Sequence, residues 1–261
     1  MIPPYSGPLS FSVGPLHYQL FGALVVTGVL VGHRVVLRLA AARGIDVAEM
    51  RAAAAWALVA GFIGAHVVDT VFYHPEKIAA DGVVALLKIW DGISSYGGFL
   101  GALVGVGFYF FRLKKSWWPH ADILMQGLVF GWIFGRLGCT LASDHPGTLT
   151  SFPLAFAYPT GARHNLGFYE LLFTVLVLVP AILALHARER SAGYRPGIYT
   201  AAIAALYAPA RFLMDFLRAT DLPHSDPRVY GLTAAQYISV VVFVLALALL
   251  RKSARPLATT A

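Results

Sequence analysis

Seven long apolar stretches, separated by polar or Pro- and Gly-containing loops, constrain the fold of this chain more than any other feature. A helix needs roughly 20 mostly apolar residues to cross a hydrocarbon core, where it satisfies its own backbone hydrogen bonds. The stretches are residues 16–39, 52–73, 92–111, 121–141, 168–186, 197–217 and 232–250. With 58% hydrophobic and 13% charged residues and a mean hydropathy of +0.68, the composition excludes an ordinary soluble domain. We therefore expect an all-α polytopic membrane protein with about seven transmembrane helices, forming a single integral membrane domain over residues 1–261.

The basic residues are distributed unevenly between the two sides of the expected spans. Of the 20 Lys and Arg residues, 13 lie in the loops after the first, third and fifth stretches or after the seventh. By the positive-inside rule these segments face the cytoplasm, so we expect the N-terminus outside and the C-terminus in the cytoplasm. The net charge of +7 then reflects membrane topology, and we expect no nucleic-acid partner.

Ionisable residues inside the expected spans are the first candidates for a site, because a charge within a membrane is costly. Arg136 lies toward the outer end of the fourth span, where flanking glycines let a backbone or a lipid headgroup approach. Arg211, Asp215 and Arg218 close the sixth span at spacings of four and seven, which predicts one shared helix face. A guanidinium presents a fork of donors that suits phosphate oxygens, so these arginines form a candidate phosphodiester clamp. The alternative is that they only neutralise buried carboxylates.

Three further polar segments surround the expected outer side of the spans. Residues 144–147 follow the fourth span, and residues 163–170 precede and open the fifth. Both contain a carboxylate and a histidine, which beside a cationic clamp suit general acid–base catalysis, although a solvated loop is the alternative. Residues 90–101 open the third span with glycines and hydroxyls, which either line a site or permit close helix packing. The chain has a single cysteine, and we expect neither a metal site nor a cofactor.

Several short blocks resemble those of the bacterial prolipoprotein diacylglyceryl transferase family, in their order and spacing along most of the chain. They are Phe11–Pro15, the glycine-rich segment Trp90–Gly98, Gly135–Gly138, the group Arg163, His164, Tyr169 and Glu170, and Arg211–Arg218 followed by Asp221. The resemblance implies a multi-pass enzyme of the bacterial inner membrane whose active site lies near the outer face.

The resemblance also implies the reaction and its site. Diacylglycerol passes from phosphatidylglycerol to the lipobox cysteine sulfur in the signal peptide of a prolipoprotein, with glycerol phosphate leaving. The partners are these two substrates and the membrane lipid. The implied catalytic residues are Tyr96, Arg136, Asp144 and Arg211, with the two arginines on the phosphate. The implied substrate-binding residues are Gly97, Gly98, Gly138, Cys139, Gly147, His164, Glu170, Asp215 and Arg218.

The chain departs from the family pattern at functional positions. Tyr96 stands where the family has a histidine, and a phenol is a poor base at neutral pH. Cys139 and Asp144 stand where the family has Asn and Glu. Asp144, His145 or His164 then becomes the candidate proton acceptor, unless the arginines alone promote ionisation of the incoming thiol. The alternative function is a non-catalytic or altered-specificity lipid-binding membrane paralogue; a transporter is less well supported, because the sequence has no inverted repeat.

Overall fold

The computed structural model describes residues 10–13, 16–89, 91–92, 94–222 and 225–254. It confirms the all-α prediction, because seven helices are long and apolar enough to cross a membrane. They cover residues 20–42, 47–73, 96–113, 117–142, 166–192, 198–217 and 234–253. The predicted starts of the first, third and seventh spans were too early. Residues 16–19 and 232–233 form short strands, and Ser94 caps the third helix by accepting a bond from the Gly97 amide.

The chain divides into two compact units, and the division falls within two of the long helices. The first unit comprises residues 1–35 and 121–261, and the second comprises residues 36–120. The first contains strands β1 (Ser10–Val13), β2 (Leu16–Gln19), β3 (Pro146–Leu149), β4 (Phe156–Tyr158), β5 (Gly161–Asn165), β6 (Arg228–Val229) and β7 (Leu232–Thr233). Its helices are most of α1 (Leu20–Ala42) and α5 (Trp117–Ala142), with α6 (Leu166–Phe173), α7 (Val179–Ala192), α8 (Ile198–Met214) and α9 (Ala234–Ala254).

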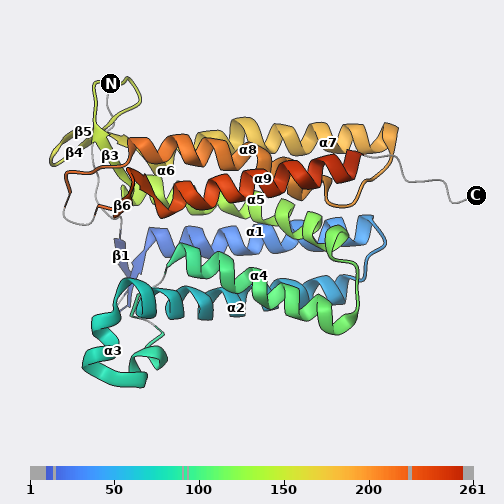
Figure 1. The fold of residues 1–261 in the computed structure, drawn as a ribbon, viewed down its shortest axis with the longest axis horizontal. Coiled ribbons are helices and arrows are strands. Elements are labelled where there is room, and N and C mark those ends of the chain that lie inside the picture. The colour runs from blue at the N-terminus through green and yellow to red at the C-terminus, as the bar shows by residue number, and fades with distance from the viewer. Residues whose placement is uncertain (1–9, 14–15, 90, 93, 223–224, 255–261) are drawn as a thin grey trace, which may run out of the picture. The chain divides into compact units, whose positions relative to one another are not determined.

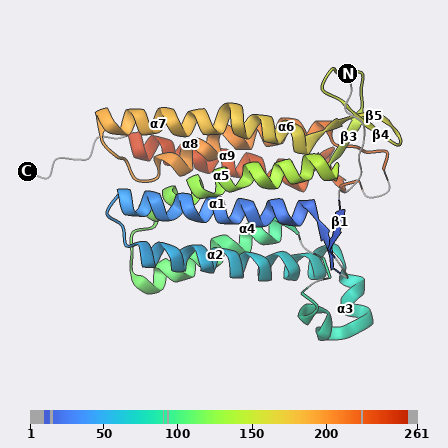
Figure 2. The same cartoon turned by 180° about the vertical axis from the view of Figure 1, so that it is seen from behind.

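Helices α7, α8 and α9 of the first unit lie side by side, and both ribbon views show this layer (Figures 1 and 2). Its apolar core contains Leu178, Ile182, Tyr199 and Ile203. A π-helical turn, Thr174–Leu178, joins α6 to α7 within one span. The helices therefore form a continuous scaffold that ends where the short strands begin.

Close backbone contacts and one buried carboxylate hold α1 and α8 to α5 in the first unit. A Cβ on Gly28 would lie 2.6 Å from the Gly131 carbonyl oxygen, so α1 and α5 cross at glycines. Asp122 of α5 is completely buried and accepts hydrogen bonds from the amides of Gly197 and Thr200, at 2.8 Å each. The Thr200 and Tyr194 hydroxyls also donate to it, at 2.7 and 2.9 Å. Asp122 thereby satisfies donors at the start of α8.

A small antiparallel sheet in the order β3–β5–β4 lies at one end of the first unit. Gly147 of this sheet is buried, and a Cβ there would lie 2.5 Å from the Leu217 carbonyl oxygen. The β6–β7 hairpin turns through Tyr230 and Gly231, both with positive φ, as a two-residue hairpin turn requires. These turns bring segments distant in sequence to the ends of α5, α6 and α8.

The second unit contains α2 (Val47–Val68) and α4 (Ser95–Leu113), which pack closely along their glycines. A π-helical turn (Asp69–Tyr73), α3 (Pro75–Asp81) and a 3₁₀ turn (Gly82–Leu87) connect these helices. Buried His66 contacts the carbonyl oxygens of Gly92 and Ala85, each at 3.2 Å. It is therefore a satisfied structural histidine.

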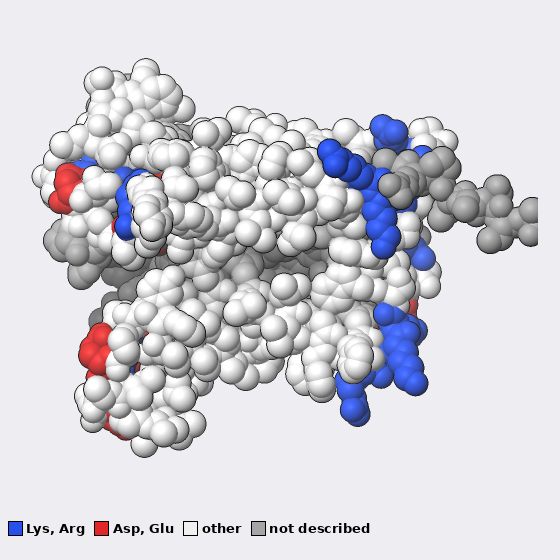
Figure 3. Space-filling view, viewed as in Figure 1, with Lys and Arg blue, Asp and Glu red and all other residues white. Residues whose placement is uncertain are grey.

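The outward faces of the long helices are apolar. Val104, Leu176, Leu213 and Leu245 are each about 60% exposed, which suits contact with lipid tails. Figure 3 shows Lys and Arg gathered at one end of the helices in each unit. In the first unit the last turns of α7 and α9 contain Arg190, Arg251 and Lys252, and in the second unit the last turn of α4 contains Arg112. This segregation follows the predicted positive-inside pattern, while the direction of insertion remains a prediction.

Candidate active site

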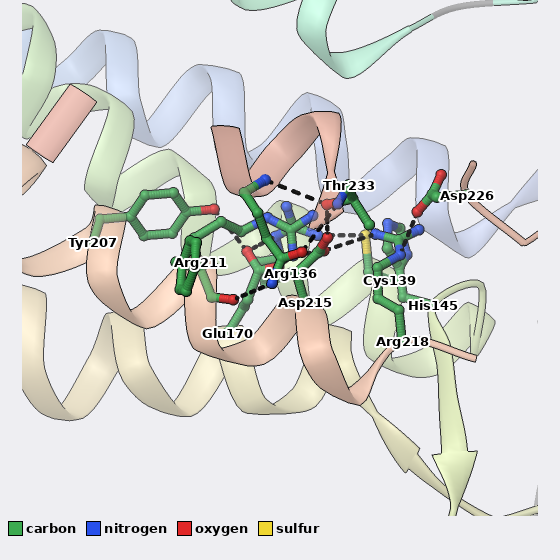
Figure 4. A network of polar contacts seen from close by, with 12 residues as sticks. Arg136, Cys139, His145, Glu170, Tyr207, Arg211, Asp215, Arg218, Asp226 and Thr233 are labelled. Carbon is green, nitrogen blue, oxygen red and sulfur yellow. Dashed lines mark hydrogen bonds and ion pairs between the residues drawn. The ribbon is translucent and has the colours of Figure 1, made fainter. Parts of the chain in front are cut away.

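Two arginines from different helices of the first unit converge on one buried glutamate (Figure 4). Glu170 of α6 is 2% exposed. Its Oε2 lies 3.0 Å from Nε of Arg136 in α5, and its Oε1 lies 3.7 Å from Nη1 of Arg211 in α8. The carboxylate therefore holds two guanidiniums side by side, at the end of the bundle near the sheet.

Two aromatic side chains complete the surroundings of this pair. The Tyr207 hydroxyl donates to Oε2 of Glu170 at 2.9 Å. The Arg136 guanidinium lies over the Trp132 ring, 4.3 Å from its centroid, a favourable cation–π arrangement. Tyr207 is not among the predicted site residues, although its position one turn before Arg211 on the same helix was a usable signal.

Asp215 is the second buried carboxylate of the site. Its Oδ1 lies 2.9 Å from Arg211 Nη1 and 3.8 Å from Arg218 Nη1, and its Oδ2 accepts a bond from the Thr233 hydroxyl. The predicted single helical face was wrong beyond residue 214. There α8 gives way to a 3₁₀ turn, Asp215–Leu217, and Arg218 is extended. In a 3₁₀ turn the side chains of residues three positions apart lie one above the other, so Arg218 still reaches Asp215.

Among the described residues, this network pairs three guanidiniums with three carboxylates. Arg136, Arg211 and Arg218 share the two buried carboxylates, Glu170 and Asp215. Arg218 Nε also pairs with Asp226 at 2.5 Å, but the Asp226 side chain is 41% exposed, so water screens that pair. Arg136 and Arg211, with side chains 11% and 15% exposed, are therefore the more buried cations of the network, and Arg218 is 25% exposed.

Cys139, Asp144 and His145 form a second polar group in the first unit, and it borders the arginine pair. One donor atom from each residue lies within 4.8 Å of the donor atoms of the other two. Nη1 of Arg136 is 3.8 Å from the Cys139 sulfur, and a carboxylate oxygen of Asp144 bonds to Nδ1 of His145. Ser143 has φ of +51° and turns the chain after α5, which folds residues 144 and 145 back toward Cys139. Sequence spacing alone did not predict this meeting.

Arg163, also in the first unit, forms a separate pair with Asp221. The Arg163 side chain is 2% exposed and donates to Asp221 at 2.9 and 2.5 Å, and to the Gly147 carbonyl at 3.0 Å. The guanidinium lowers the pKa of the Asp221 carboxyl, and the same hydrogen bonds raise the pKa of Arg163. This bidentate pair ties β5 to the segment after α8, which is a structural role.

His164 lies in the same sheet and contacts the Tyr169 hydroxyl through Nδ1, at 2.8 Å. Partial burial lowers the pKa of His164, which favours its neutral form. The predicted substrate-binding residues of the first unit are thus divided between several places. Glu170, Asp215 and Arg218 join the arginine network, Gly147 and His164 belong to the sheet beside it, and Cys139 lies in the second polar group.

The comparisons with known proteins identify the family. A model of the prolipoprotein diacylglyceryl transferase family matches residues 8–251. The chain belongs to this family. It is 30% identical to the phosphatidylglycerol–prolipoprotein diacylglyceryl transferase of Cereibacter sphaeroides, over 97% of each chain. The enzymes of the same name from Rhizobium leguminosarum bv. trifolii and Actinobacillus pleuropneumoniae are 31% and 27% identical, over 82% and 95% of this chain and 79% and 94% of theirs.

Membership of the prolipoprotein diacylglyceryl transferase family confirms the resemblance deduced from the sequence blocks. The chain is accordingly a multi-pass membrane transferase of lipoprotein biosynthesis. The individual site residues stay predictions, because family membership assigns them no role.

The family's glycine-rich segment belongs to the second unit. A Cβ on Gly97 would lie 2.3 Å from the Gly64 carbonyl oxygen and 2.6 Å from the Val68 Cβ, so Gly97 lets α4 approach α2. Gly98 is less tightly packed, and Tyr96 lies in the first turn of α4. Gly138, in the first unit, packs against the Phe21 ring, 3.0 Å from where its Cβ would lie. Packing therefore accounts for Gly97 and Gly138 without a substrate.

Proposed function

We propose that this protein transfers the diacylglyceryl group of phosphatidylglycerol to the lipobox cysteine of a prolipoprotein signal peptide, near the outer face of the bacterial inner membrane. The cysteine thiolate attacks the glyceryl carbon, the bond from that carbon to the phosphate oxygen breaks, and glycerol phosphate leaves. Family membership supports the reaction, and the pairing of Arg136 with Arg211 on Glu170 supports the site.

Arg136 and Arg211 hold the phosphate in this proposal. Among the described residues, the contacts of Arg136 use its Nε and Nη1, which leaves Nη2 to donate to a phosphate oxygen. Glu170 fixes both guanidiniums before substrate arrives, so little reorganisation is needed when negative charge develops on the leaving phosphate.

The Asp144–His145 pair accepts the thiol proton in this proposal. An imidazole suits proton transfer near neutral pH, whereas the Tyr96 phenol does not. His145 is oriented by its hydrogen bond to Asp144, and both residues border Cys139, which itself contacts Arg136. The proton acceptor thus lies next to the proposed phosphate site.

The test is a transfer assay with purified protein, phosphatidylglycerol vesicles and a lipobox peptide, read by mass spectrometry. Arg136→Lys and Arg211→Lys keep a positive charge but lose the planar fork. We expect each to lower the transfer rate by roughly 10²–10³-fold, the usual loss when a preorganised donor to a developing oxyanion is removed. Arg112→Lys, exposed at the far end of α4, is the matched control and should retain the wild-type rate.

The variants must first elute as the wild type does on size exclusion, so that misfolding is distinguished from lost chemistry. Full transfer by correctly folded Arg136→Lys and Arg211→Lys proteins would contradict the phosphate role. Tight retention of phosphatidylglycerol by the wild type without any product would instead favour the lipid-binding alternative. In that case Tyr96→His combined with Cys139→Asn, which restores the family's residues, should produce activity in a degenerate enzyme.

A further inference from the structure

Cys139, Asp144 and His145 combine donor types that bind thiophilic divalent cations. A thiolate, an imidazole and a carboxylate are all ligands of zinc, and structural and catalytic zinc sites use such mixed sets. Their donor atoms lie within 4.8 Å of one another, so small side-chain rotations would bring all three to one ion. Sequence spacing did not indicate this set, because Cys139 lies in α5 whereas Asp144 and His145 lie after the end of that helix.

The backbone on both sides of the group is held in place by neighbouring segments. The amide of Leu166 donates to the His145 carbonyl at 3.1 Å, which fixes the loop after α5. A Cβ on Gly167 would lie 2.9 Å from the Cys139 Cβ, so α6 packs directly on the cysteine. The three ligands are therefore positioned by the fold, and binding would require little ordering.

The group contacts Arg136 on one side and gives an ion access from water on the other. Arg136 Nη1 contacts the Cys139 sulfur at 3.8 Å, which fixes the direction of the side chain. Asp144 is exposed and the His145 side chain is 28% exposed. Asp144 also borders a cavity of about 200 Å³ lined by residues that include Phe21, Gly138 and Leu141. An ion could enter from this side and keep a fourth position for water.

We propose that Cys139, Asp144 and His145 form a three-ligand site for a thiophilic divalent cation of the zinc class. A bound ion would displace to water the proton between Asp144 and His145 and the thiol proton of Cys139. It would also occupy the proposed proton acceptor beside Arg136, so the cation would inhibit transfer. The inhibition rests on the proposed function, whereas cation binding does not.

The test uses full-length protein in detergent, titrated with Co²⁺ as a spectroscopic probe and with Zn²⁺ as a competitor. We expect one Co²⁺ per chain with a sulfur-to-cobalt charge-transfer band, which Zn²⁺ abolishes. Cys139→Ser should remove this band. Asp144→Asn and His145→Ala should each weaken binding by at least about tenfold, because even partners of metal ligands contribute 10–100-fold.

His74→Ala is the matched control, because His74 pairs with Glu76 at 2.9 Å as another exposed histidine–carboxylate pair, but in the second unit. It should leave the cobalt spectrum unchanged. Absence of the charge-transfer band, or a wild-type band in Cys139→Ser, would overturn the site. A protein that transfers the diacylglyceryl group normally but binds no cation refutes this inference alone, and a protein that binds the cation but shows no transfer even when metal-free refutes the proposed function alone.

Discussion

Glu170 should be the residue whose loss destabilises the first unit most, because it is the buried counter-ion of two arginines. Glu170→Ala leaves Arg136 without its ion pair at 3.0 Å, weakens the surroundings of Arg211 and deprives the Tyr207 hydroxyl of its acceptor. Removing one partner of a buried ion pair costs about 3–5 kcal/mol. At roughly 2–4 °C per kcal/mol for a chain of this size, the melting temperature should fall by about 6–20 °C.

The measurement is thermal unfolding of the purified proteins in one detergent. Glu170→Gln keeps the shape and an acceptor for Tyr207, so its melting temperature should fall by less than that of Glu170→Ala. Arg136→Met combined with Glu170→Met removes both charges, and it should be more stable than Glu170→Ala. Glu76→Gln, at an exposed pair, is the control and should melt with the wild type.

The result that would refute this reasoning is a Glu170→Ala protein that melts within about 2 °C of the Glu76→Gln control, below the shift that 1 kcal/mol would produce. Equal melting of the double variant and Glu170→Ala would also count against it. In either case an uncompensated buried charge would not be the cause of the loss.

Three other predictions concern the scaffold around the site. Asp122→Asn should lower the free energy of unfolding by about 1–3 kcal/mol in denaturant titrations, because one amide oxygen cannot accept the four hydrogen bonds that the carboxylate accepts; a wild-type value would contradict it. Gly97→Ala should lower the free energy of unfolding by about 1–3 kcal/mol, because the new Cβ would overpack the contact with α2. Gly22→Ala, with nothing within 4 Å of the new Cβ, should leave the free energy of unfolding unchanged. Equal melting temperatures of the two variants would refute the close contact. The pKa of Asp221 is lowered in the folded protein by Arg163, so the stabilisation is complete above the ordinary Asp value of about 3.9 and is lost as pH falls through the folded value. Asp221→Asn should therefore melt below the wild type at pH 7 and together with it at acidic pH, and a constant difference would exclude the ion pair.

The sequence alone predicted the membrane architecture and the candidate residues, but it did not predict which of these residues form pairs. Arg136 and Arg211 stood out because charges inside apolar stretches are rare. The carboxylate that joins them, Glu170, opens a different helix, and the sequence could not indicate that it pairs with both. The structure shows that both arginines pair with buried carboxylates, whereas their binding of a phosphate stays a prediction.

The sequence by itself determined the seven helices and the family, because apolar length and short ordered blocks are local properties that survive without coordinates. Only the tertiary structure decided that Cys139 meets Asp144 and His145, and that α8 ends in a 3₁₀ turn before Arg218. The first depends on the left-handed residue Ser143 and on the close contact of Gly167 with Cys139. The second depends on the tight turn that follows α8. Such features are set by packing, which residue type and spacing do not specify.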